Sequence, residues 1–258
     1  MRKIDNFAQI SGLLNAQLKR GVLTNNFLRG EDYTREIENG LYLHEADGAL
    51  LLFRERGTHL VMTFYLHPGA VLSLPETDRP IVTELSCRAK DAEAMANAAA
   101  QFCALGFRET LRRTRRTRKP EPFSSETTAF PAEPEDFADI SRFLSDHFPP
   151  LTGCIPTEDD LHENLEDGHT VITRDEKGVS GVLHFAVSRA STEIRHLAVR
   201  EDCRRLGLAG ELLTAYLAAT DGAKSQVWAR TGNLPAEHFY EKHGYRPDGW
   251  TSAVLQYH

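Results

Sequence analysis

The chain has 258 residues, of which 41% are hydrophobic and 26% are charged, and its net charge is −7. This composition is usual for a globular chain and excludes a disordered or fibrous one. No apolar run reaches the roughly 18–20 residues of a transmembrane helix, and residues 1–10 carry no secretory signal, so we expect no membrane partner. Four cysteines without CxxC spacing favour a reducing cytoplasm over a disulfide framework or a zinc site.

The first half of the chain is predicted to alternate helices with strands. Helical spacing, and a run rich in the strong helix former alanine, predict helices at residues 4–18, 33–38 and 91–105. β-rich runs predict strands at residues 41–44, 49–53, 59–66, 81–85 and 108–118. A basic run at residues 112–119 is interpreted as a charged strand and linker that face solvent.

Prolines mark a boundary after these elements. Pro120 and Pro122 remove backbone donors and break regular structure, and serines continue the polar stretch. We therefore expect two domains, residues 1–122 and 123–258, with a loop inside one larger domain as the alternative.

The second half has its own series of elements. Helices are predicted at residues 134–148, 157–167, 207–219 and 235–243. Strands are predicted at residues 127–130, 170–174, 181–187, 192–199 and 226–229, with one or two more within 245–258. Hairpins followed by strand–helix–strand units indicate an α/β fold with a mixed, mostly antiparallel central sheet flanked by helices.

A short signature occurs once in each half. Phe102 is followed by three residues, Gly106 and an aromatic residue, and Tyr240 is followed in the same way by Gly244 and Tyr245. The two copies lie 138 residues apart (244 against 106), which is about one domain length, and both follow a similar order of elements. The sequence therefore predicts a duplicated fold.

The most informative segment, residues 193–213, leads from a β-rich run through Arg204-x-x-Gly207-x-Ala209 into a helix. Small residues let backbone amides approach a ligand, and the unpaired N–H groups of a helix's first turn attract anions. The pattern suits a phosphate or pyrophosphate, with an ordinary strand–helix turn as the alternative. The motifs GxxxxGK[ST], GxGxxG, HExxH and GxSxG are absent, which disfavours nucleotide hydrolases, dinucleotide enzymes, metal enzymes and serine hydrolases.

A second segment, residues 233–245, follows a strand and opens another helix. Its Ala236, Phe239 and Tyr240 share one helix face. The two aromatic residues are either core residues or, in the case of the tyrosine hydroxyl, a proton donor beside a leaving group. Cys203 has no predictable histidine partner, so we interpret it as a structural loop residue rather than a nucleophile.

Together these two segments resemble the GNAT superfamily of acyl-CoA-dependent N-acyltransferases. The resemblance covers about residues 126–258: residues 204–209 match the pyrophosphate loop, and residues 233–245 match the downstream strand–helix signature. The first half is similar only in layout, lacks the loop, and has Phe102 where the second half has Tyr240. The chain therefore looks like a tandem GNAT protein whose first copy has lost the cofactor site.

The resemblance implies acetyl-CoA as co-substrate and no metal. The residues that it implies in cofactor binding are Leu197, Ala198, Val199, Arg204, Arg205, Leu206, Gly207, Leu208, Ala209, Gly210, Asn233, Ala236 and Tyr240. It also implies two catalytic residues. Tyr240 would protonate the departing thiolate, and Glu193 lies eleven residues before Arg204, the spacing of the base in the histone-acetylating branch.

A base is also required on physical grounds. A lysine-like amine with a pKa of about 10.4 is almost entirely protonated at neutral pH. A carboxylate can take this proton directly or through one water. Regular alternation places Glu193 on one strand face with Leu197 and Val199, and His196 on the other, unless a bulge resets the count. We favour Glu193 over His196, and a solvated glutamate paired with Arg195 is the alternative.

We therefore expect an N-acetyltransferase that moves an acetyl group from acetyl-CoA to a primary amine by direct sequential transfer. The acceptor would be a small-molecule or peptide amine. The sequence leaves open whether the protein forms a homodimer. The alternative is a non-catalytic CoA-binding or protein-interaction module built from two degenerate GNAT domains. We expect no nucleic-acid partner, because residues 131–258 hold 21 acidic against 12 basic residues and the basic run has little aromatic interleaving.

Overall fold

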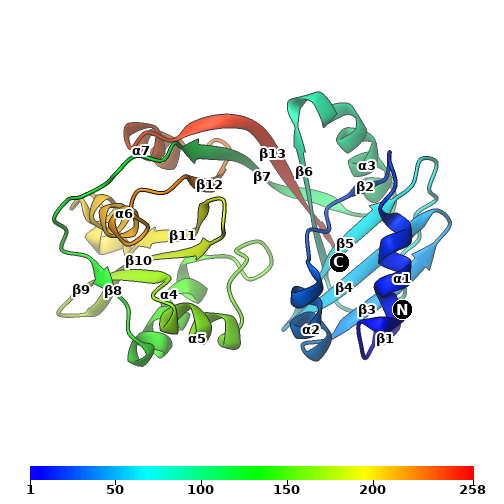
Figure 1. The fold of residues 1–258 in the computed structure, drawn as a ribbon, viewed down its shortest axis with the longest axis horizontal. Helices are drawn as coiled ribbons and strands as arrows, with labels where there is room; N and C mark the ends of the chain where they lie inside the picture. Colours follow the sequence, from blue (N-terminus) through cyan, green and yellow to red (C-terminus); the bar gives the residue numbers. More distant parts are fainter. The chain divides into compact units, whose positions relative to one another are not determined.

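The computed structural model describes residues 1–258, which form two compact units (Figure 1). Unit 1 consists of Met1–Arg112 and Trp250–His258, and unit 2 consists of Arg113–Gly249. Two strands, β7 (Arg108–Arg118) and β13 (Arg246–Tyr257), therefore begin in one unit and end in the other.

This division differs in two segments from the one expected at residue 122. Residues 113–122 belong to unit 2, and residues 250–258 belong to unit 1. Each unit therefore receives one strand from the part of the chain that forms mainly the other unit. The C-terminal segment is one strand, β13, rather than two.

Unit 1 contains strands in the order β1-β3-β4-β5-β6-β13-β7. Besides β7 and β13, these are β1 (Arg2–Ile4), β3 (Leu41–Ala46), β4 (Ala49–Arg56), β5 (His59–Leu66) and β6 (Ile81–Arg88). Pairing is antiparallel from β1 to β5 and between β6 and β13, whereas β5 and β6 are parallel. A short strand that the sequence did not indicate, β2 (Leu23–Thr24), pairs with the end of β5.

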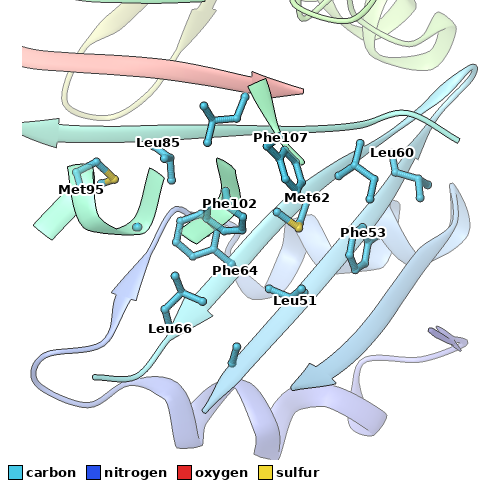
Figure 2. Packing of buried hydrophobic residues seen from close by; sticks show 14 of the residues in the cluster. Leu51, Phe53, Leu60, Met62, Phe64, Leu66, Leu85, Met95, Phe102 and Phe107 are labelled. Carbon is cyan, nitrogen blue, oxygen red and sulfur yellow. The ribbon is translucent and has the colours of Figure 1, made fainter. Parts of the chain in front are cut away.

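The sheet of unit 1 has an apolar layer on each face, because successive side chains of a strand point to opposite sides. Leu50 and Leu52 of β4 pack in the layer formed with α1 (Ala8–Gln17) and α2 (Gly30–Glu38). Leu51 and Phe53 pack in the other layer, with α3 (Ala92–Ala104), which follows a 3-10 turn at Ala89–Asp91. Figure 2 shows this second layer, in which Phe102 of α3 lies against Phe64 and Phe107.

Unit 2 contains strands in the order β7-β12-β11-β10-β9-β8. Besides β7, these are β8 (Phe130–Pro131), β9 (Thr170–Asp175), β10 (Gly178–Val187), β11 (Thr192–Val199) and β12 (Ser225–Arg230). Only β11 and β12 are parallel, so the expected mixed, mostly antiparallel sheet flanked by helices is confirmed.

Helices cover both faces of this second sheet. Val182 packs in one apolar layer with α4 (Phe137–His147), which follows a 3-10 turn at Pro134–Asp136, and with α5 (Glu158–Glu166). Leu183 packs in the other layer, with α6 (Leu208–Ala219) and α7 (Leu234–Lys242). Thr157 caps α5 as expected, since its hydroxyl accepts a hydrogen bond from the Asp160 N–H.

Two local predictions are wrong for identifiable reasons. The helix expected at residues 4–18 begins only at Ala8, because Arg2–Ile4 pairs with β3. The strand expected at residues 127–130 shortens to Phe130–Pro131. Thr127 and Thr128 instead form hydrogen bonds with Glu211 of α6, and the Thr128 N–H donates to the Glu211 carboxylate at 2.7 Å.

The basic run forms the expected strand, but only part of it faces solvent. Arg116 is 5% exposed and forms ion pairs with Glu237 and Glu241 of α7, the second at 3.0 Å. Arg115 pairs with Asp248 at 2.7 Å. Much of the positive charge on β7 is therefore matched by carboxylates within unit 2.

The four cysteines are free thiols. None of the helices combines the length and apolar character that crossing a membrane requires.

Candidate functional site

The parallel strands β11 and β12 pair only over their first residues. Pairing runs from Thr192–Ser225 to Ile194–Val227 and ends there, although β11 continues to Val199. On its other edge, β11 stays paired with β10 as far as Val199. The later half of β11 therefore has one edge without a strand partner.

The N–H groups on this unpaired edge can be identified. The Arg200 N–H donates to the Ser180 carbonyl oxygen of β10 at 2.8 Å. Successive N–H groups of a strand point to alternate edges. The N–H groups of Leu197 and Val199 therefore point away from β10, towards the unpaired edge.

A bulge at Arg195 changes which side chains of β11 share a face. His184 of β10 pairs with His196 and the next residue pairs with Ile194, so Arg195 has no cross-strand partner. Beyond a bulge the alternation reverses. Ile194, Leu197 and Val199 pack together in the layer with α6, whereas Ala198 packs in the layer with α4. Glu193 consequently shares a face with His196, and the expectation that it lies on the face of Leu197 and Val199 is wrong.

A buried chain of hydroxyl groups holds the paired ends of β11 and β12 together. The Tyr216 hydroxyl of α6 forms hydrogen bonds with Thr192 of β11 and with Ser225 of β12. The Ser225 hydroxyl in turn lies 2.6 Å from the Tyr245 hydroxyl. This network gives Tyr245, the last residue of the repeated aromatic signature, a structural role where the two strands meet.

The turn that follows β11 leads through a 3-10 turn at Glu201–Cys203 into α6. Arg205 and Gly207 have positive φ angles of 66° and 87°. The backbone N–H groups of residues 205–209 donate to no acceptor within the protein, and helical bonding begins with the Gly210 N–H. A Cβ atom on Gly207 or Gly210 would meet no protein atom within 4 Å. The turn thus presents consecutive N–H donors and open space at the positive end of a helix dipole.

Charged side chains hold the beginning of this turn. Arg200 forms ion pairs with Asp175 of the β9–β10 hairpin and with Asp202, the second at 2.6 Å. The Arg200 guanidinium holds the carboxyl pKa of both aspartates below the usual range. Burial raises the pKa of the neighbouring Cys203 thiol. A protonated thiol is a weak nucleophile, in agreement with a structural role for Cys203.

Glu193 is already engaged by two side chains. Its carboxylate accepts a hydrogen bond from Gln226 Nε2 of β12 at 2.7 Å and lies 3.0 Å from Arg195 Nη1. Its side chain is 17% exposed. The ion pair that the sequence offered as an alternative therefore exists, and it holds the carboxylate beside the first unpaired residue of β11.

His196, the other candidate base, uses both ring nitrogens. Its Nε2 lies 2.7 Å from the Gly153 carbonyl oxygen, and its Nδ1 lies 3.1 Å from His184 Nδ1. A carbonyl oxygen only accepts, so His196 carries its proton on Nε2 and accepts at Nδ1. Burial lowers its pKa to about 4. In this arrangement neither nitrogen is available to take a proton from an amine.

Helix α7 carries the remaining expected site residues. Asn233 caps it, the side-chain oxygen accepting a hydrogen bond from the Ala236 N–H at 3.3 Å. Tyr240 is buried in the apolar layer that Leu197 and Val199 line, and its hydroxyl forms no hydrogen bond within the protein. Burial raises the pKa of this hydroxyl, so it stays a proton donor over the ordinary pH range.

The structure brings most of the expected residues to one side of the sheet. Leu197, Val199, Ala236 and Tyr240 belong to one apolar layer, and residues 204–210 lie at the start of the helix packed in it. Glu193 lies on the opposite face. Several residues that hold these positions carry no signal in sequence motifs: Tyr216, Ser225, Gln226 and His184.

Comparison with known proteins agrees with this geometry. Residues 166–247 match the family model described as the acetyltransferase (GNAT) domain, and they include β11, the turn and α7. The chain contains a GNAT acetyltransferase domain. No curated protein matches the chain.

Solved structures similar to the chain extend the GNAT fold beyond the matched segment. An acetyltransferase from the GNAT family of Colwellia psychrerythraea is 14% identical, has a TM-score of 0.56, and the match covers 98% of this chain and 97% of that one. A GCN5-related N-acetyltransferase from Sphaerobacter thermophilus is 13% identical, with a TM-score of 0.57 and coverage of 89% and 85%. A tandem GNAT protein from the clavulanic acid biosynthesis pathway is 13% identical, with a TM-score of 0.52 and coverage of 81% and 78%. At these identities the likeness establishes the fold.

Proposed function

We propose that unit 2 is an N-acetyltransferase that moves an acetyl group from acetyl-CoA to a primary amine by direct sequential transfer. The new C–N bond forms as the C–S bond breaks, and the amine loses a proton while the thiolate gains one. The observation that carries the proposal is the row of N–H donors at residues 205–209, which lack acceptors at the N-terminus of α6.

The turn suits a pyrophosphate for three reasons. Its N–H groups need an acceptor, the helix dipole favours an anion, and the glycines leave room where side chains would block approach. Arg204 and Arg205 add positive charge at the exposed surface. Acetyl-CoA would supply the diphosphate and the reactive thioester, and no metal is needed for this binding mode.

The unpaired edge of β11 would hold the rest of the donor. The N–H groups of Leu197 and Val199 would bond the amides of the pantetheine arm and the thioester oxygen. As the carbonyl carbon is attacked, negative charge develops on that oxygen, and a fixed N–H donor such as that of Val199 stabilises it. Asn233 and Ala236 lie at the start of α7, where they would border the same arm.

Proton transfer requires a base for the amine and an acid for the thiolate. Glu193 is the proposed base, directly or through a water, because the nitrogens of His196 are committed elsewhere. Tyr240 is the proposed acid, since its hydroxyl is protonated and has no partner within the protein. The ion pair with Arg195 and the hydrogen bond from Gln226 hold the Glu193 carboxylate in place.

Unit 1 is proposed to be a degenerate GNAT copy without a donor site. Its parallel strands β5 and β6 also separate early, but the Asn25 side chain lies between them. It accepts a hydrogen bond from the Phe64 N–H at 2.8 Å and donates to the Glu84 carbonyl oxygen at 3.0 Å. We therefore expect one molecule of acetyl-CoA per chain.

The deciding experiment measures acetyl-CoA binding by calorimetry and thiol release with a panel of amines. The panel comprises a polyamine, an aminoglycoside, a free amino acid and a lysine-containing peptide. Binding of one equivalent and amine-dependent thiol release are expected. Binding without turnover on any amine supports the alternative, a CoA-binding module. Absence of binding refutes both.

The role of Glu193 has a separate test. Removing the charge in Glu193→Gln should lower kcat about 100-fold and displace the acidic limb of the pH–rate profile. Glu163→Gln, on the neighbouring helix α5, is the control for loss of one carboxylate. An acidic limb at the same pH in Glu193→Gln would place the base elsewhere.

A further inference from the structure

Two buried histidines form a hydrogen-bonded chain that ends on the segment between α4 and α5. His184 of β10 and His196 of β11 are cross-strand partners, 5% and 2% exposed, with stacked rings. Because the Gly153 carbonyl oxygen accepts from His196 Nε2, the other ring nitrogen of His196 must accept from His184 Nδ1–H. The chain of donors therefore runs in one direction, from His184 through His196 to Gly153.

The environment of His184 requires the same direction of hydrogen-bond donation. His184 Nε2 is buried and has no hydrogen-bond partner, so a proton there would leave a buried donor unpaired. Burial lowers the pKa of His184 to about 3, and both rings are neutral at physiological pH. Each histidine is thereby held in a single tautomer.

The segment that receives this hydrogen bond is packed tightly against β11. The Phe148 ring meets the His196 ring edge-on, with centroids 4.6 Å apart. A Cβ atom at Gly153 would come within 2.8 Å of the Phe148 side chain, so the turn closes only with glycine there. On the neighbouring residue, the Thr152 carbonyl oxygen accepts a hydrogen bond from Arg113 of β7 at 2.5 Å. Residues 148–157 are thus tied to two strands of unit 2.

We propose that His196 is a positioning residue, which holds residues 148–157 over the β11 face that carries Glu193 and so shapes the binding site of the acceptor amine. The inference rests on the proposed function, because it takes Glu193 as the base. His196 lies next to Leu197, the first strand residue proposed to bind the donor. One strand would therefore align donor, base and acceptor segment.

The test compares two substitutions at position 196. His196→Phe keeps a ring against Phe148 but removes the donor to Gly153. His196→Gln keeps an N–H group near the place of Nε2. His196→Phe should raise the acceptor KM about tenfold, measured with the amine of the panel that gives the fastest thiol release, and leave acetyl-CoA affinity within twofold. His196→Gln should restore most of the lost acceptor affinity.

Amide hydrogen exchange supplies a readout that does not need turnover. In His196→Phe, exchange should accelerate about tenfold across residues 148–157 while α6 keeps its protection. In His196→Phe alone, the buried His184 N–H loses its acceptor, which could itself disturb folding. The double variant His184→Phe/His196→Phe removes that donor as well, so faster exchange in both variants is due to the lost bond to Gly153. Unchanged exchange in the segment overturns the inference. If the wild type acetylates no amine but exchange across residues 148–157 still accelerates in His196→Phe, the proposed function fails. The role of His196 in positioning this segment is then retained.

Discussion

Units 1 and 2 each contain a parallel strand pair whose pairing ends early, but they satisfy the unpaired edges differently. In unit 1, pairing of β5 with β6 ends at Val61–Val82, and the Asn25 side chain then bridges the Phe64 N–H and the Glu84 carbonyl oxygen. In unit 2, pairing of β11 with β12 ends at Ile194, and the edges beyond it carry no such bridge. Backbone groups need partners. Unit 1 supplies one from its own chain, whereas in unit 2 we propose that the donor substrate supplies it.

Two further differences point the same way. Residues 67–80, which connect β5 to β6, contain no helix, whereas the connection from β11 to β12 contains α6 with its row of N–H donors. Phe102 packs among the rings of unit 1, where unit 2 has Tyr240 with an unpartnered hydroxyl. The comparison teaches that two sheets with similar strand pairing can differ in whether a side chain of the protein fills the gap between the parallel strands.

The largest expected effect is that of Gly207→Glu. A carboxylate at this position brings like charge to the proposed anion site, and a side chain strains the φ of 87°. Acetyl-CoA binding, measured by calorimetry, should disappear.

Gly57→Glu is the matched control in unit 1, because Gly57 also has a positive φ, of 55°, and open space around it. Its acetyl-CoA affinity should equal that of the wild type. Equal loss in both variants, or retained binding in Gly207→Glu, would contradict the difference between the units.

The next effect is on the stability of unit 1. Asn25→Ala removes the hydrogen bonds that the Asn25 side chain forms with the Phe64 N–H and the Glu84 carbonyl oxygen. This loss should lower the unfolding free energy by about 2–4 kcal/mol. Asn15→Ala, an exposed position on α1, is the control and should change stability little. Urea unfolding measures the cost, and calorimetry with acetyl-CoA should still give one site per chain. A second site in Asn25→Ala would mean that Asn25 alone closes a functional copy.

Exchanging the two aromatic residues gives a smaller, reciprocal effect. Tyr240→Phe removes the proposed acid and should lower kcat about 100-fold, with acetyl-CoA affinity nearly unchanged. Phe102→Tyr instead buries a hydroxyl at a fully buried position of unit 1, which should cost about 1–3 kcal/mol of stability without altering turnover. Wild-type turnover in Tyr240→Phe would leave Tyr240 a packing residue.

The predictable part of this protein is what local pattern encodes. The glycines and small residues of 204–210 indicated the turn because its backbone conformation and its helix start depend on local sequence. The mixed sheet followed from the order of hairpins and strand–helix–strand units. The helices expected at residues 91–105 and 235–243 are present as α3 and α7, because helical spacing and alanine content are also local properties.

The unpredictable part depends on contacts between distant residues. The bulge at Arg195 has no sequence signature, yet it moves Glu193 to the other face of β11. Asn25 is one asparagine in a polar stretch, and its partners Phe64 and Glu84 lie 39 and 59 residues away. The exit of β13 from unit 2 into unit 1 likewise depends on pairing with β6, which no local pattern specifies.

The smallest effect concerns the pH dependence of stability. The pKa values of His184 and His196 fall from 6.5 to about 3 and about 4, mainly through burial, with Arg195 and Arg113 adding repulsion and Asp160 opposing it at His184. Below pH 6.5 these two histidines become protonated in the unfolded chain but stay neutral in the folded one. The unfolding free energy is therefore highest well above this pH and decreases as the pH falls through 6.5 towards the folded-state pKa values of about 4 and about 3.

Between pH 7 and pH 6 the unfolding free energy of the wild type should therefore fall by about 1 kcal/mol through this pair. Urea unfolding at both pH values should show a flatter dependence in His184→Phe/His196→Phe. His59 of unit 1 is a single buried histidine whose pKa is also lowered by burial, so His59→Phe should flatten the dependence less. Equal slopes in all three proteins would mean that the pair titrates near its ordinary pKa. The hydrogen bonds from His184 through His196 to Gly153 would then be broken in solution. Unit 2 would in that case contain no pair of buried histidines held in fixed tautomers, and this difference from unit 1 would disappear.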